Sequence, residues 1–159
     1  MILDETLEFA DAVSVAAVAG TALIGDVIDL GATHRDIGVG DPLYLVITTD
    51  TEIITAGAAG TIQFKLASDA QAAIATDGTA TVHLETKAFV TDDAALNDAQ
   101  LNAAGVIAVM ALPMEGTVYE RYLGLLAVIV TTEVTAGKIN AFLTRDVAKW
   151  ASYANAVGA

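Results

Sequence analysis

The sequence predicts an all-β fold, an antiparallel β-sandwich, and three observations support this. Segment 61–66 alternates between polar and apolar residues, which places Ile62, Phe64 and Leu66 on one face of a strand. Other runs are apolar throughout and rich in β-branched residues, which is typical of buried strands. Turn residues separate the runs, and strands do not alternate with helices. We therefore expect seven or eight strands in two packed sheets.

The expected strands follow one another with turn signals between them. Segment 81–85 repeats the alternation of 61–66 and places His83 on its polar side. Asp77-Gly78, directly before it, is the best local candidate for a hairpin turn. Segment 139–144 alternates more weakly. The apolar runs that complete the set are 43–47, 106–112 and 122–130.

Two segments have helical character. Residues 69–75 are rich in alanine and predict one or two helical turns. Thr91 precedes two aspartates, as expected of a helix N-cap, and Gly105 is positioned to end that helix. Leu96 and Leu101 would then face the core. Both helices are expected as excursions from the sandwich.

The two ends of the chain differ from its middle. Residues 1–22 are acidic and then rich in Ala and Val, with Leu3, Leu7 and Phe9 as their large anchors. We expect an extended N-terminal arm that lies along a neighbouring chain or a sheet edge. Residues 147–159 are expected to form a C-terminal tail that Trp150 and Tyr153 anchor. The remaining residues, 23–146, would form the sandwich of a single domain, 1–159.

Charge and composition exclude several classes of protein. The formal net charge of −13 argues against nucleic-acid binding, which needs a basic surface. The absence of cysteine excludes disulfides and thiolate chemistry. Neither a signal peptide nor a run of apolar residues long enough to cross a membrane is visible, so we expect a soluble protein.

The charge is unevenly distributed, and the sequence as a whole is apolar. Residues 1–120 hold 18 acidic and 3 basic residues, whereas residues 121–159 hold 2 and 4. Charged residues make up 17% of the chain, against about 25% in ordinary domains. A surface with so few charges loses little when it is desolvated, as expected of a protein in permanent contact with partners.

Residues that could perform catalysis or bind cofactors do not form recognisable motifs. His34 and His83 fall in separate elements, and no serine lies in a G-x-S-x-G turn. The pair Gly38 and Gly40 does not complete a dinucleotide-binding pattern. The carboxylate clusters at 26–29 and 92–98 do not match a calcium-binding loop. We expect no catalytic, cofactor-binding or metal-binding residues, and hence no enzyme.

The stretch DIGVGDPLY at 36–44 is the most specific of several motifs that follow one another along nearly the whole chain. In this order the motifs resemble the Bbp16-type capsid cement (decoration) proteins of tailed bacteriophages. The sequence departs from the family pattern in an Ala-rich region at 92–104 and in a longer tail after Lys149. The other matching segments are 1–4, 26–31, 112–113, 120–123 and 135–139.

This resemblance implies a jelly-roll sandwich with a structural role. Such a protein would bind the outer face of a shell of HK97-fold major capsid protein, bridge capsomers and associate with copies of itself around a capsid symmetry axis. It would be made in the bacterial cytoplasm and end on the virion, without a cofactor and without contact to nucleic acid or membrane. Arg121 could pair with Asp29 or Asp36. The candidate contact residues are Leu3, Leu7, Phe9, Arg121, Trp150 and Tyr153.

Two other functions stay open. A jelly-roll could bind carbohydrate or a host surface, although one Trp and four Tyr offer few rings for stacking on sugars. An enzyme with an unrecognised carboxylate site is the third possibility.

Overall fold

Nine β-strands in two antiparallel sheets make up most of the described part of the chain. A computed structural model describes residues 5–31, 37, 41–55, 57, 59–92, 97–113 and 118–147. Two short 3-10 turns accompany the strands, η1 (Glu5–Leu7) and η2 (Ala99–Leu101). The strands are β1 (Glu8–Ser14), β2 (Gly20–Asp29), β3 (Tyr44–Thr55), β4 (Gly60–Asp69), β5 (Thr81–Glu85), β6 (Phe89–Thr91), β7 (Val106–Ala111), β8 (Tyr122–Val130) and β9 (Val134–Thr144).

The strand order is that of a jelly-roll. The first sheet has the order β1-β9-β3-β7, and the second has the order β2-β8-β4-β5, with β6 also paired to β4. Strand β1 thus pairs with β9, β2 pairs with β8, and β3 pairs with β7. Strands β5 and β6 both pair with the same edge of β4. This nested antiparallel pairing is expected when a long hairpin wraps into two sheets. The all-β prediction is confirmed.

The core lies between the two sheets, where alternate residues of each strand point inward. In β4, Ile62, Phe64 and Leu66 are buried, as the alternation of 61–66 predicts. They face Leu45 and Ile139 of the other sheet within one continuous apolar cluster. Burial of such side chains stabilises the sandwich by roughly 1.5–3 kcal/mol for each of them.

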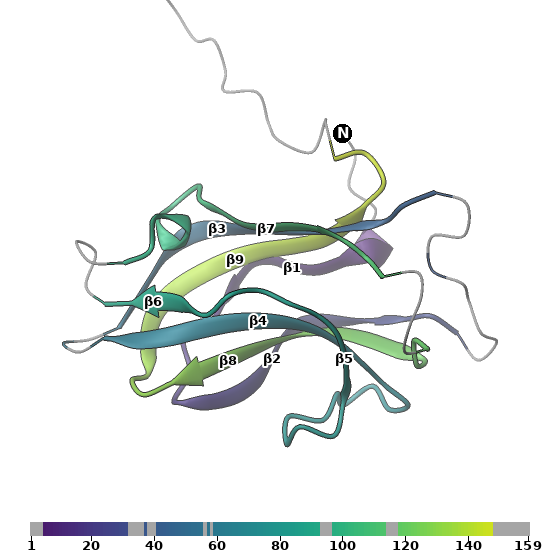
Figure 1. The fold of residues 1–159 in the computed structure, drawn as a ribbon, viewed down its shortest axis with the longest axis horizontal. Coiled ribbons are helices and arrows are strands. Elements are labelled where there is room, and N and C mark those ends of the chain that lie inside the picture. Colours follow the sequence, from purple (N-terminus) through teal and green to yellow (C-terminus); the bar gives the residue numbers. More distant parts are fainter. Residues whose placement is uncertain are drawn as a thin grey trace, which may run out of the picture.

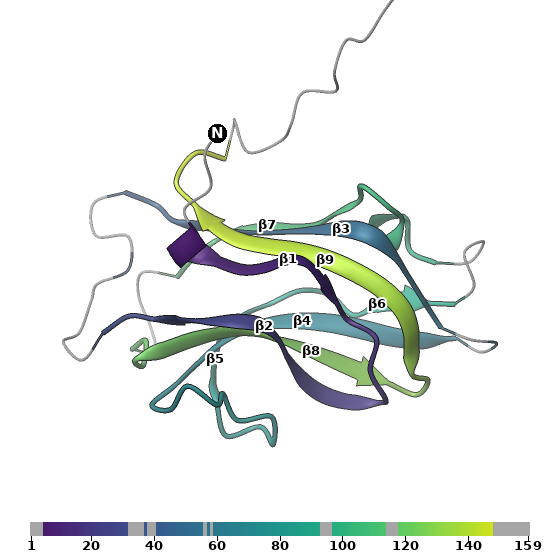
Figure 2. The same cartoon turned by 180° about the vertical axis from the view of Figure 1, so that it is seen from behind.

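One side of the sandwich is tightly closed. Strands β1 and β2, the edges of their respective sheets, contact each other along this side (Figure 2). Gly25 has φ +65°, and a Cβ atom built on it would lie 1.9 Å from the carbonyl oxygen of Phe9. The two sheets approach each other this closely because glycine has no side chain. The opposite side carries β7 and the pair β5 and β6 (Figure 1).

The connection between β4 and β5 covers part of the outer face of the second sheet. Residues 70–80 fold beneath that sheet (Figure 1), and Ile74 packs on Ala67 and Leu126 in a second apolar cluster. Gly124 leaves room for Ile74, since an added Cβ would lie 2.9 Å from its Cγ1 atom. The helix expected at 69–75 is therefore wrong: these residues cover a sheet face, and their backbone follows bends.

The strand predictions are confirmed, but their number and the N-terminal boundary need correction. Predicted segments 81–85 and 122–130 coincide with β5 and β8. The expected arm, 1–22, instead contains β1, which is an edge strand, and the start of β2. The sandwich therefore begins at Glu8, before the predicted residue 23. In β1 and β2 the apolar residues are interrupted by alanine, glycine and aspartate, and β6 is only three residues long, so none of these strands has a clear pattern in the sequence.

The second expected helix is also wrong. Thr91 ends β6, and Leu101 is buried in a single 3-10 turn after Asp98. Asp98 holds this connection by side-chain contacts: it accepts hydrogen bonds from the Val90 amide at 2.9 Å and from Lys87 Nζ at 3.2 Å. The predicted inward position of Leu96 lies outside the described residues.

Candidate interaction site

Strand β7 is an edge strand without the features that usually prevent an edge from pairing with another chain. Its sequence, VIAVMA, contains no charged residue and no proline. Its one register shift against β3 lies at the start, near Val106. Val106 and Val109 are 45% and 37% exposed. An edge of this kind offers unpaired backbone donors and acceptors to an additional strand.

The other edges carry such features. Strand β1 contains Glu8 and Asp11, a residue with positive φ at Ala12, and two register shifts. Strand β2 has Asp26 within its own register shift. Strands β5 and β6 are only five and three residues long. Among the described strands, β7 is thus the edge best suited to pairing.

A pocket of about 290 Å³ lies beside β7, where the edges of the two sheets face each other. Apolar and polar side chains from both edges line this pocket. The apolar lining residues are Phe89, Val106, Ile107, Ala108 and Met110, and the polar ones are Glu85, Thr86, Lys87 and Gln100.

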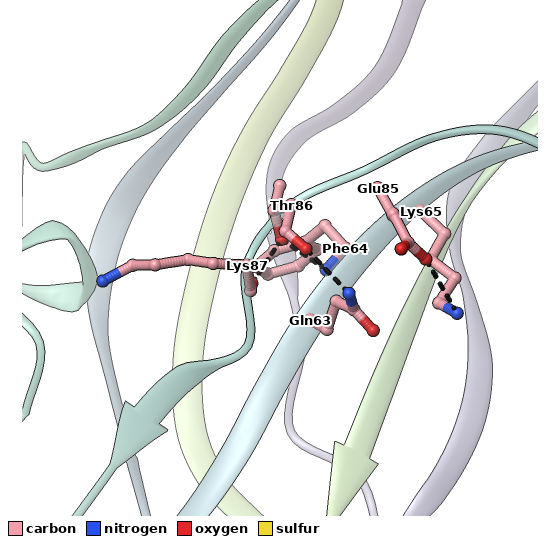
Figure 3. A network of polar contacts seen from close by, with 6 residues as sticks. All are labelled: Gln63, Phe64, Lys65, Glu85, Thr86 and Lys87. Atoms are coloured by element: carbon pink, nitrogen blue, oxygen red, sulfur yellow. Dashed lines mark hydrogen bonds and ion pairs between the residues drawn. The ribbon is translucent and has the colours of Figure 1, made fainter.

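Thr86 shapes the sheet-2 side of this pocket by interrupting the edge strand between β5 and β6. Its hydroxyl accepts a hydrogen bond from the Phe64 amide at 3.1 Å and donates one to the Lys87 carbonyl at 2.8 Å. Gln63 Nε2 donates to the Thr86 carbonyl at 2.7 Å (Figure 3). These bonds replace the ladder bonds lost at the break, so the edge stays attached to β4 while its backbone leaves the regular path.

The charges beside the pocket are paired. Lys65 Nζ lies 3.3 Å from Glu85 Oε2 (Figure 3), and Lys87 Nζ lies 3.2 Å from Asp98 Oδ2. Lys87 Nζ also lies 4.8 Å from the centre of the Phe89 ring. The hydrogen bond from the Val90 amide lowers the pKa of Asp98, and Lys87 adds to this effect, so the carboxylate is charged at neutral pH. The pocket opening is close to electrically neutral, in contrast to the acidic chain as a whole.

A second cluster of polar residues, around His83, closes one end of the sandwich. The His83 ring stacks on Tyr119 at a centroid distance of 3.9 Å, and its Nε2 atom lies 2.7 Å from Ser68 Oγ. Ser68 Oγ accepts a hydrogen bond from the Glu120 amide at 3.0 Å, so its own proton is available to His83. The prediction that His83 lies on the polar side of its strand is wrong, because a register shift between Leu66 and Ala67 reverses the alternation of β5.

This cluster has the residue types of a nucleophile and its base, but not their accessibility. Ser68 is completely buried, so its hydroxyl cannot reach a dissolved substrate in this conformation. Burial lowers the pKa of His83, which the Glu120 carboxylate opposes in part. Burial also raises the pKa of Tyr119 to about 12. The arrangement favours a neutral histidine that ties β4 and β5 to the residues before β8.

The partly buried His83 predicts that the protein loses stability in mild acid. The pKa of His83 is lower in the folded than in the unfolded chain, so unfolding takes up a proton as the pH falls through the unfolded value of about 6.5. The free energy of unfolding should therefore decrease between about pH 7.5 and about pH 5.5, by at most about 1.4 kcal/mol per pH unit for this one site. Urea denaturation at a series of pH values measures this.

The control for this prediction is His83→Gln, which keeps a polar side chain and leaves His34 as an unchanged second histidine. Its free energy of unfolding should vary less over the same range. An equal pH dependence in both proteins would contradict the assignment to His83.

The structure places the predicted contact residues in different environments. Phe9 is completely buried in the core, so the prediction that it contacts a partner is wrong. Leu7 is partly buried against the same core. Arg121 is exposed, and its Nε and Nη2 atoms donate to both carboxylate oxygens of Asp29 at 2.9 and 2.8 Å, which confirms the expected pairing with Asp29. Leu3, Trp150 and Tyr153 lie outside the described residues.

The sequence did not single out the edge and pocket at β7. The run 106–112 predicts a buried strand, which is correct for Ile107 and Ala108 but not for the exposed Val106 and Val109. The complete lack of charge in this run was the available signal, but only the strand order shows that β7 is an edge.

No group of three or more His, Cys, Asp or Glu side chains within the described residues is arranged to hold a metal ion. No helix among them has the length and apolar character needed to cross a membrane.

The family model described as Bbp16 matches residues 9–143, which includes all the strands except the first residue of β1 and the last of β9. No curated protein matches the chain significantly.

Proposed function

The chain belongs to the Bbp16 family, and from this premise we propose that it is a non-enzymatic cement protein of a tailed bacteriophage. It binds the outer face of the shell of major capsid protein and stabilises the mature head. It is made in the bacterial cytoplasm, and its partners are the major capsid protein and further copies of itself.

The uncharged edge of β7 is the observation that best supports a docking function. In a chain of net charge −13, it combines open backbone groups, exposed valines and a neighbouring pocket of balanced charge. The acidic character of the chain supports a site outside the shell, since negative charge is repelled by packaged nucleic acid. The His83 cluster offers no accessible nucleophile, because Ser68 is buried.

The proposed mechanism is mechanical. A protein that contacts two or more capsomers binds the assembled shell better than the free subunit, and so stabilises the shell by mass action. Several weak contacts in one bound molecule also retain it far more firmly than any single contact would.

Cosedimentation with purified empty shells of the same phage tests this proposal. We expect the protein to sediment with the shells in a saturable manner and to raise their disruption temperature. A protein that stays in the supernatant at all concentrations would overturn the proposal.

Truncated proteins extend the experiment to the chain ends. Removal of residues 148–159 or of residues 1–7 should lower occupancy, whereas a cut beyond residue 8 would also remove the core residue Phe9. Unchanged occupancy after both truncations would contradict a role of the ends in binding.

A further inference from the structure

We propose that β7 receives an extended segment of the shell subunit as an additional strand, and that one apolar side chain of this segment occupies the pocket beside β7. This inference rests on the proposed function, and it adds the position, the binding mode and the chemistry of the segment.

The backbone of β7 is arranged for such an addition. The Leu112 amide donates to the Leu43 carbonyl at 2.8 Å, which makes these two residues a hydrogen-bonded pair. Because such pairs alternate along an antiparallel ladder, Met110 also bonds toward β3, whereas Val109 and Ala111 direct their backbone groups to the open side. No described strand pairs with this side.

The pocket lies where the side chains of an added strand would point. A strand paired to β7 extends the first sheet, so its inward side chains face the edge of the second sheet at Thr86 and Phe89, which line the pocket. The volume of about 290 Å³ is roughly twice that of an apolar cavity of about 150 Å³ that admits benzene. One large aliphatic or aromatic side chain therefore fits.

Charge restricts the segment further. The ion pairs of Lys65 with Glu85 and of Lys87 with Asp98 leave no net charge at the pocket opening. The rest of the acidic chain repels a negatively charged segment and attracts a positively charged one. We therefore infer a segment that is neutral or basic and has an apolar residue at its centre.

A second copy of β7 does not fit as well. The inward residues of β7, Ile107, Ala108 and Met110, already pack against the core of their own sandwich. Two copies joined through β7 would therefore leave their pockets unfilled, whereas a separate segment brings an inward side chain of its own.

Site-specific photo-crosslinking tests the inference, since the chain has no cysteine and a single introduced thiol is unique. A benzophenone is attached at Val109→Cys and, as a control, at Val130→Cys, an exposed valine on β8 of the other sheet. Both proteins are incubated with empty shells and irradiated. We expect Val109→Cys to crosslink to the shell subunit through a peptide that mass spectrometry identifies, and Val130→Cys to give at least about tenfold less of this product.

The outcomes separate the two proposals. Shell binding without a crosslink at Val109→Cys overturns the inference and leaves the proposed function intact, and so does a crosslink only to a second copy. A wild-type protein that does not bind shells overturns both.

A backbone variant provides a second test. Val109→Pro removes the backbone N–H that points to the open side. Val109→Thr keeps this N–H and has a side chain of nearly the same shape as valine. We expect Val109→Pro to bind shells about tenfold more weakly or worse, which corresponds to about one lost hydrogen bond, and Val109→Thr to bind like the wild type. Thermal denaturation of both variants checks that they are folded, and equal binding by folded Val109→Pro would overturn the inference.

Discussion

Phe9→Ala is expected to destabilise the isolated protein by about 3–5 kcal/mol, the usual cost of removing a buried phenylalanine. Phe9 is completely buried and belongs to the central apolar cluster, although it lies only one residue after the start of β1. The substitution removes the largest buried side chain of β1 and leaves a cavity in the core. The free energy of unfolding, measured by urea denaturation with the slope checked for two-state behaviour, gives the loss.

Val18→Ala is the matched control, because Val18 lies in the same N-terminal region but is 73% exposed. It should change stability by no more than about 0.5 kcal/mol. A Phe9→Ala protein that kept full stability and lost only its binding to shells would contradict the burial of Phe9 in the core. Phe9 would then be a contact residue of an arm, as the sequence suggests.

Gly25→Ala should also reduce stability strongly, by about 3 kcal/mol or more. Two costs add: a left-handed backbone costs a non-glycine residue roughly 1–2 kcal/mol, and overpacking typically adds about 1–3 kcal/mol. The overpacking is severe because the new Cβ would lie 1.9 Å from the Phe9 carbonyl oxygen, and a backbone atom cannot move aside without separating β1 from β2.

Gly78→Ala separates the two costs. Gly78 has φ +94°, but nothing lies within 4 Å of an added Cβ. The free energy of unfolding of this variant should fall by only roughly 1–2 kcal/mol, the cost of a left-handed backbone at a residue other than glycine. Equal destabilisation of the two variants, measured by thermal or urea denaturation, would show that the close approach at Gly25 does not contribute.

These variants concern the closed side of the sandwich, and the proposed docking concerns the open side. On the closed side, β1 and β2 meet without space for a methyl group. On the open side, the edges of β7 and of β5 and β6 leave a pocket. Substitutions on the closed side should therefore change stability, and exposed substitutions on the open side should mainly change binding.

The fold class and most of the central strands could be predicted from the sequence. The alternation in 61–66 and the apolar run 122–130 identify β4 and β8 because both strands lie inside their sheet, where large side chains must be buried. The sequence also indicated the pairing of Arg121 with Asp29, which the structure confirms. Edge strands such as β1 and β2 have a less regular pattern of apolar residues, since part of their surface stays in contact with water.

Which residues are accessible could not be predicted, because accessibility depends on contacts between segments far apart in the chain. His83 turns inward because β5 shifts its register against β4, and a shift of one residue moves a side chain to the other face of the sheet. Phe9 is buried because β9, more than 120 residues later, pairs with β1. The open edge of β7 likewise depends on strand order, which arises from contacts between distant segments and leaves no local pattern in the sequence.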